Sequence, residues 1–145
     1  MVRTNINWII HLVRNGVKCE TCGEVENGFL PYLCNCHTHG MAQYNHLDFQ
    51  IVLNYPDEEL ARIMNTFGLR VQAGEKFKDG DLVEGIYEDC PVRLSKFMEC
   101  EREVLRVIVP DRQNRFPEDE GCTEPHIFQV LDTEYLMKGA WTNES

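Results

Sequence analysis

The chain has 145 residues, of which 43% are hydrophobic, and this balance allows one domain with its own core and excludes a disordered chain. Its formal net charge of −10 repels polyanions, so we expect no nucleic-acid partner. The longest apolar runs are too short to cross a bilayer, and residues 1–5 lack the pattern of a secretory signal. We therefore expect a cytoplasmic protein with no membrane partner.

The first predicted element is a short amphipathic helix over residues 5–15. Its apolar side chains recur at helical spacing, at Ile6, Ile9, Ile10 and Val13. Gly16 can end this helix, because glycine readily adopts the left-handed conformation that closes a helix. His11 lies within it and is expected to be a surface or boundary side chain.

Three further elements are expected in the middle of the chain. Residues 29–36 are predicted to be extended, and residues 48–53 form a compact apolar run that is typical of a buried strand. The clearest helix begins at Pro56, continues through Val71 and can be closed by Gly74. Proline at its start and three acidic residues in its first turn both favour a helix here.

The remainder of the sequence predicts strands and turns. The expected strands are 82–87, 91–97, 104–109 and 127–131. Strands that follow one another through short turns favour an α+β fold over a doubly wound parallel sheet. We expect a single domain with a mainly antiparallel sheet of four to six strands and two principal helices. Within it, residues 1–37 hold the N-terminal helix and a cysteine-rich segment, 38–131 the core, and 132–145 a C-terminal tail.

The densest chemical feature is a cluster of cysteines and histidines between residues 19 and 39. It contains, in order, Cys19, Cys22, Cys34, Cys36, His37 and His39. Two thiolates separated by two residues can occupy adjacent corners of a tetrahedron, and Gly23 lets the backbone turn toward them. The cluster predicts a structural zinc site made by the four cysteines, with His37 or His39 as alternates for a thiol.

Two other interpretations of the cluster remain open. Cys34 and Cys36 can belong to a strand, one of them facing the core, with Cys19 and Cys22 as loop thiols. Redox chemistry is disfavoured, because a reactive thiol pair is typically placed at a helix N-terminus. The acidic, glycine-containing stretch 23–28 is a poor helix.

A second candidate site consists of His39, His46 and Asp48, which lie close together in the sequence. These side chains can form a catalytic or metal-binding trio, or a hydrogen-bonded turn. The chain has no glycine-rich phosphate loop, no glycine-flanked nucleophilic serine and no paired-histidine zinc helix. Whether the protein is an enzyme stays open at this point.

Three stretches of the chain carry a resemblance to a known family. They are residues 38–49, with Thr-His-Gly-Met and then His-Leu-Asp-Phe, residues 56–80, and residues 109–117, with Val-Pro-Asp-Arg-Gln-Asn-Arg-Phe-Pro. From about Thr38 to Leu131 the chain thereby resembles an uncharacterised bacterial family, domain of unknown function 4262. Leu47 stands where the family tends to have proline, and Val109 and Glu118 stand where it often has tryptophan. The resemblance implies a compact α+β domain and supplies no activity.

Together these observations predict a small binding or interaction domain stiffened by a structural zinc, with an unknown protein or small-molecule partner. The alternative is a metal-assisted hydrolase or other enzyme that uses His39, His46 and Asp48.

Overall fold

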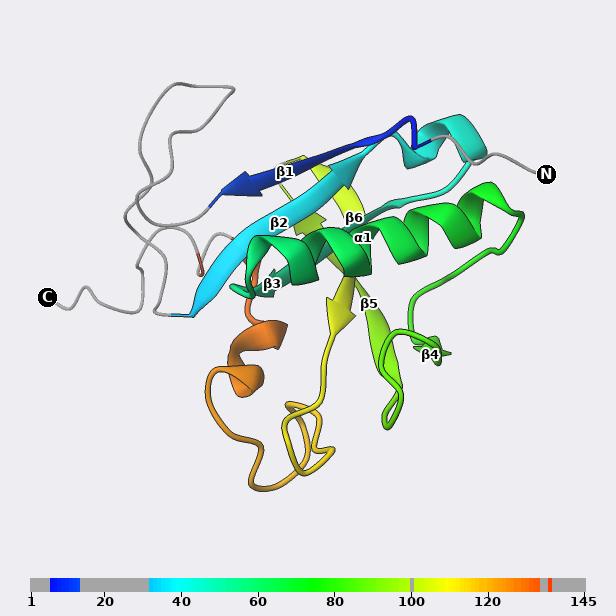
Figure 1. Cartoon of the computed structure of the whole chain (residues 1–145). Coiled ribbons are helices and arrows are strands. Elements are labelled where there is room, and N and C mark those ends of the chain that lie inside the picture. The colour runs from blue at the N-terminus through cyan, green and yellow to red at the C-terminus, as the bar shows by residue number, and fades with distance from the viewer. Residues whose placement is uncertain (1–5, 14–31, 100, 134–135, 137–145) are drawn as a thin grey trace, which may run out of the picture.

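The computed structural model describes residues 6–13, 32–99, 101–133 and 136. Six strands form one sheet: β1 (Ile9–Val13), β2 (Leu33–His39), β3 (Asp48–Leu53), β4 (Leu82–Val83), β5 (Val92–Glu99) and β6 (Arg102–Ile108). Their order is β1-β2-β3-β6-β5-β4, with β3 and β6 parallel and the other neighbouring pairs antiparallel (Figure 1). The sheet is therefore mixed but mainly antiparallel, and the α+β prediction is confirmed.

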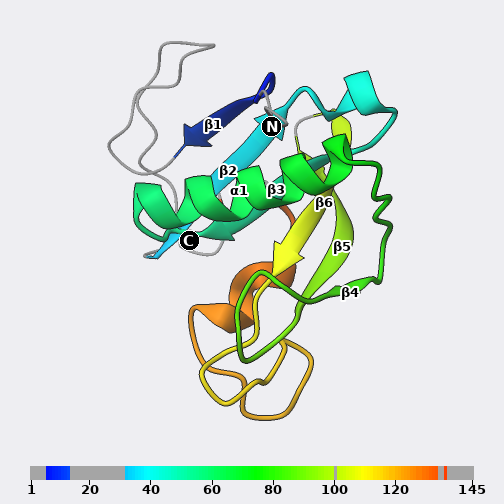
Figure 2. The ribbon, with the colours of Figure 1, turned by 45° about the vertical axis from the view of Figure 1, so that its right-hand side comes forward.

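The helix α1 (Asp57–Gln72) lies across one face of the sheet, over β2 and β3 (Figures 1 and 2). Its buried side chains recur every three or four residues, at Leu60, Ile63, Met64, Phe67 and Val71. Pro56 precedes the helix, acidic residues fill its first turn and Arg70 lies in its last turn, in agreement with the helix macrodipole. The helix predicted to begin at Pro56 is thus confirmed.

The main core lies between α1 and the sheet. Phe49 of β3 stacks on Phe67 of α1, with 4.8 Å between ring centroids. Trp8, just before β1, is 5% exposed and donates its indole N–H to Oδ1 of Asn65 at 2.9 Å. Its ring also lies directly on Gly68, where any side chain would overlap it. The start of the first strand is thereby attached to the helix.

The predicted N-terminal helix is wrong. Residues 9–13 form the edge strand β1, which pairs with residues 35–39 of β2. The apolar stretch Ile-Ile-His-Leu-Val satisfies a helical and a strand period equally well, and its β-branched residues pack well in a sheet. Consequently α1 is the one principal helix among the described residues, where two were expected.

Two later predictions also need correction. Residues 127–131 were expected to be a strand, but residues 127–130 lie in a 3₁₀ helix, η2 (His126–Val130), and Leu131 follows its end. The side chain of Gln129 instead makes the strand-like contacts, since it bonds both the N–H and the carbonyl of Val109 at 2.7 Å. The strand expected over 82–87 is limited to Leu82 and Val83, because the chain then leaves the sheet in a loop. None of the described helices is long and apolar enough to span a membrane.

We predict that Gly68→Ala lowers the free energy of unfolding by about 2 kcal/mol, because the new methyl group overpacks the Trp8 contact. Urea unfolding measures this change. In a double-mutant cycle with Trp8→Leu, the cost of Gly68→Ala should fall by more than about 0.5 kcal/mol. An unchanged cost in the Trp8→Leu background would contradict the proposed overlap.

Candidate metal centre

The sheet face that does not carry α1 holds a group of buried polar side chains beside apolar ones such as Val104 and Ile108. Side chains alternate along a strand, so the neighbours of core residues such as Phe49 and Ile51 point to this second face. Its fully or nearly fully buried polar members come from β2, β3, β5 and β6: Asn35, His37, Gln50, Glu99 and Arg106. The residues of η2 and those just after it cover part of this face, since Arg106 donates to the carbonyls of Gln129 and Leu131 at 2.6 Å.

Three histidines meet on this second face, at the edge of the sheet. His11 in β1 lies directly opposite His37 in β2, and His39 lies two residues further along β2. Their ring centroids are 4.6 to 5.6 Å apart. One ring nitrogen of each lies within 4.8 Å of the others, which makes a group able to hold a metal ion.

The trio depends on two periodicities that the sequence contains. His37 and His39 are two residues apart, and this spacing places both on one face of a strand. His11 joins them only because residues 9–13 are a strand, whose pairing with β2 places it beside His37. Because residues 9–13 were predicted to be helical, His11 was not grouped with His37 and His39. The sequence therefore identified two of the three histidines of the trio.

His37 is the buried member of the trio, with 4% of its surface exposed. Its Nδ1 lies 3.0 Å from Oδ1 of Asn35 and 3.7 Å from Oε2 of Glu99. A histidine whose Nδ1 is held by an amide oxygen beside a carboxylate has its Nε2 available, which is the usual support for a histidine that binds metal. His11 and His39 are partly exposed, so the trio runs from the interior toward the surface.

The histidines of β2 are biased toward the neutral form. Burial lowers the pKa of His37 to about 4, against the opposing effect of Glu99. Burial also lowers the pKa of His39, and the Arg102 guanidinium adds to this shift. Burial alone would raise the pKa of Glu99, but His37 and Arg102 outweigh it and hold that pKa below its usual value. Neutral imidazoles beside a carboxylate are the state in which histidines bind metal.

Arg102 joins three strands at the border of the trio. Its guanidinium donates to Glu99 Oε1 at 2.9 Å, to Asp48 Oδ2 at 2.7 Å and to the backbone carbonyl of Thr38 at 2.8 Å. Asp48 in turn accepts from the Thr38 hydroxyl and from the backbone N–H of Met41. These contacts fix the end of β2, which bears His39, against the start of β3 and the end of β5.

The cysteines predicted to bind zinc divide into two groups. Cys34 and Cys36 are fully buried, belong to the hydrophobic core, and the Cys34 thiol lies 3.6 Å from the Leu53 carbonyl. Cys19 and Cys22 lie outside the described residues. The four-cysteine site therefore stays a prediction, while the alternates His37 and His39 lie together with His11.

The second predicted trio, His39, His46 and Asp48, is engaged in separate contacts. His46 Nδ1 lies 2.8 Å from the Leu47 carbonyl, and His46 Nε2 accepts the backbone N–H of Phe77 at 2.9 Å. Both ring nitrogens of His46 are thus occupied, and its ring stacks on Phe49. Asp48 is engaged with Arg102 and the turn after β2, and His39 belongs to the β1–β2 trio.

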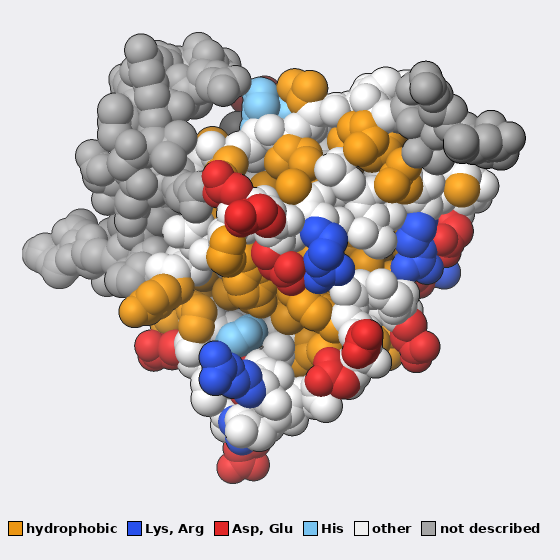
Figure 3. Space-filling view, viewed as in Figure 1, with side chains coloured by type: hydrophobic (Ala, Val, Ile, Leu, Met, Phe, Trp, Pro, Cys, Tyr) orange, Lys and Arg blue, Asp and Glu red, His pale blue; other side chains and the backbone are white. Residues whose placement is uncertain are grey.

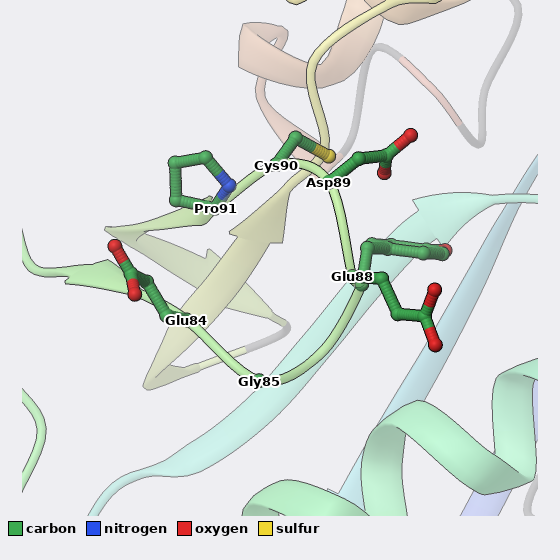
Figure 4. Close-up of a pocket in the computed structure, with 7 residues that line it drawn as sticks. Glu84, Gly85, Glu88, Asp89, Cys90 and Pro91 are labelled. Atoms are coloured by element: carbon green, nitrogen blue, oxygen red, sulfur yellow. The ribbon is translucent and has the colours of Figure 1, made fainter.

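A hollow of about 390 Å³ lies elsewhere, in the loop of residues 84–91 between β4 and β5. Figure 4 shows that the carboxylates of Glu84, Glu88 and Asp89 point in different directions around it. Burial and the neighbouring Asp89 raise the pKa of the Cys90 thiol on its wall, so that thiol is protonated at neutral pH. This hollow shares no residue with the histidine trio, and its three carboxylates do not point toward a common position.

Charged side chains do not form a single-sign surface on the face that carries α1. Figure 3 shows acidic and basic groups interspersed there among hydrophobic side chains. Local charge on this face therefore singles out no particular partner.

Comparison with known proteins identifies no relative: no family model matches the chain, and neither does any curated protein or solved structure. The resemblance to domain of unknown function 4262 stays a prediction, and the functional proposal rests on the chain's own residues.

We predict that Arg102→Gln lowers the free energy of unfolding by about 3 kcal/mol, because it leaves two largely buried carboxylates without their cation. Lys96→Gln is the matched control on the adjoining strand, since its pair with Glu103 is exposed and its N–O distance is 3.9 Å. We expect that change to stay below about 0.5 kcal/mol. Equal losses in the two variants would contradict the role of Arg102.

In protein prepared without metal, stability should fall as the pH is lowered through the His37 titration. The pKa of His37 is lower in the folded chain, about 4, than the ordinary 6.5 of an unfolded one, so the unfolded state takes up the proton first. Between about pH 7 and pH 5 this linkage removes about 2 kcal/mol. His37→Gln should lack that component in urea unfolding at the two pH values. If His37→Gln loses as much free energy of unfolding between pH 7 and pH 5 as the wild-type protein does, groups other than His37 cause the loss.

Proposed function

We propose that this chain is a metal-binding domain whose His11, His37 and His39 bind one Zn²⁺ ion. The observation that carries the proposal is the convergence of the three ring nitrogens to within 4.8 Å. Tetrahedral zinc with bonds of about 2 Å places its ligand nitrogens about 3.4 Å apart. Small rotations of three side chains on two paired strands supply this contraction.

The chemistry of the ligands favours zinc over other cations. Imidazole suits borderline ions such as Zn²⁺, whereas Ca²⁺ and Mg²⁺ prefer oxygen ligands. Asn35 Oδ1 lies 3.0 Å from His37 Nδ1, with the Glu99 carboxylate 3.7 Å from the same atom, and a hydrogen-bond acceptor at the second ring nitrogen typically supports a zinc-bound histidine. The lowered pKa of His37 and of His39 keeps protons from competing with the metal near neutral pH.

Binding, rather than catalysis, is the function that these contacts support. Three histidines leave a fourth coordination position, which catalytic zinc sites use for water. Among the described residues, the hollow in the loop of residues 84–91 shares no residue with the trio, so the proposal is limited to metal binding. The hydrolase alternative stays a prediction, as do the cytoplasmic location and an unknown protein or small-molecule partner.

Zinc titration of metal-free protein tests the proposal. We expect one ion per chain at the trio, and single alanine substitutions of His11, His37 or His39 should each weaken binding on the order of 100-fold. Zinc at 100 times its Kd should add about 2.7 kcal/mol to the free energy of unfolding. The matched control is His126→Gln, which removes a histidine outside the trio.

A paired substitution separates this site from the predicted cysteine site. Cys19→Ser with Cys22→Ser should leave the zinc affinity of the trio unchanged, and Co²⁺ should show a spectrum without thiolate charge-transfer bands in that variant. Zinc binding that survives loss of all three histidines and disappears with the two cysteines would refute the proposal and support the four-cysteine site.

A further inference from the structure

A directional chain of hydrogen bonds runs across the second face of the sheet and ends at His37. It passes from Arg106 on β6 to Gln50 on β3 and Asn35 on β2. Each of these residues is at most 1% exposed. Amide groups can turn end for end, so the direction of such a chain depends on a member that can only donate.

Arg106 is that member. A guanidinium has no acceptor, so its Nε–H, 2.7 Å from Gln50 Oε1, fixes that atom as the amide oxygen. Gln50 must then present its NH₂ to Asn35, 2.9 Å away. Thr133 agrees with this direction: its hydroxyl donates to the Met98 carbonyl at 2.6 Å, and its oxygen accepts from Arg106 and Gln50.

The orientation of Gln50 fixes that of Asn35. The atom that accepts from Gln50 is Asn35 Oδ1, which leaves Nδ2 to donate to Glu99 Oε2 at 3.2 Å. A carboxylate can only accept, so this second contact demands the same orientation. Both neighbours of Asn35 therefore select one of its two possible positions.

His37 then has one compatible neutral tautomer. Its Nδ1 lies 3.0 Å from an oxygen that can only accept, so Nδ1 carries the proton. The lone pair of the neutral ring is on Nε2. The opposite tautomer would place two lone pairs against each other at that distance.

We propose that Arg106, acting through Gln50 and Asn35, holds His37 in the tautomer that presents the Nε2 lone pair to a metal ion. This inference rests on the proposed function, because it deepens the role of one zinc ligand. Arg106, Gln50 and Asn35 are positioning residues: they touch no metal, and they prepare His37 before a metal arrives. Preparation of a ligand in this way typically contributes about 10- to 100-fold to metal affinity.

Nitrogen NMR of metal-free, ¹⁵N-histidine-labelled protein tests the tautomer directly. Two-bond ¹H–¹⁵N correlations distinguish the two neutral forms, and loss of one ring system in His37→Gln assigns the signals. We expect His37 as the Nδ1–H tautomer at neutral pH. An Nε2–H tautomer in the wild-type protein would overturn the inference.

Gln50→Glu tests the direction of the chain. The carboxylate still accepts from Arg106 but places an acceptor against Asn35 Oδ1, so one of the two contacts that orient Asn35 becomes repulsive. Glu99 still favours the original orientation, so the Nε2–H tautomer of His37 should appear in part of the population. Zinc affinity should then fall about 10- to 100-fold. An unchanged Nδ1–H population in Gln50→Glu would overturn the role of Arg106 and Gln50.

Gln129→Glu is the matched control. Gln129 is also fully buried beside Arg106, but its side chain bonds Val109 and His126 rather than Asn35. This variant should lose stability without changing the His37 tautomer. If Gln50→Glu fails to fold, Asn35→Leu removes the acceptor instead and should give a mixture of tautomers, whereas a single Nδ1–H form would refute the chain.

The two proposals fail separately. An Nδ1–H tautomer in a protein that binds no zinc would refute the metal site and leave the hydrogen-bond direction standing. Zinc bound by the trio with His37 as the Nε2–H tautomer in the metal-free protein would refute the positioning role and leave the metal site standing.

Discussion

The burial of one cation shapes the second face of the sheet. Arg106 is fully buried, and burial lowers the pKa of its guanidinium to about 9, so it stays charged at neutral pH. A buried charge is tolerated only when its donors are satisfied. Gln50, two backbone carbonyls after β6 and the Thr133 hydroxyl accept from it, and the Phe97 ring lies 3.7 Å from its central carbon.

The same requirement explains why polar side chains gather around Arg106 on this face of the sheet. Once Gln50 is turned toward Arg106, its remaining amide hydrogens need an acceptor, which Asn35 supplies. Asn35 in turn meets His37 and Glu99. Each side chain forms a hydrogen bond with the next. Both the positions of these side chains and the donor-to-acceptor direction of their hydrogen bonds are therefore fixed. The histidine trio lies at the end of this group of side chains, where β1 and β2 reach the edge of the sheet.

Prediction from the sequence succeeded where one local signal dominated. For α1, proline at the start, acidic residues in the first turn and a wide apolar side all favour the same element. The apolar runs of β3 and β6 were similarly clear. Prediction failed over residues 9–13, because five consecutive residues fit either period and only pairing with β2 decides between them. It failed again at η2, whose Gln129 side chain bonds the backbone after β6 in place of a strand.

The sequence by itself determined the fold class, the principal helix and the concentration of cysteines and histidines before residue 40. Those features follow from periodicity and from residue chemistry, which act over a few neighbouring positions. Only the tertiary structure decided which ligands meet. His11 and His37 are 26 positions apart in the chain and become neighbours through antiparallel pairing. The same pairing sends Cys34 and Cys36 into the apolar core, because alternate side chains of a strand face opposite sides of the sheet.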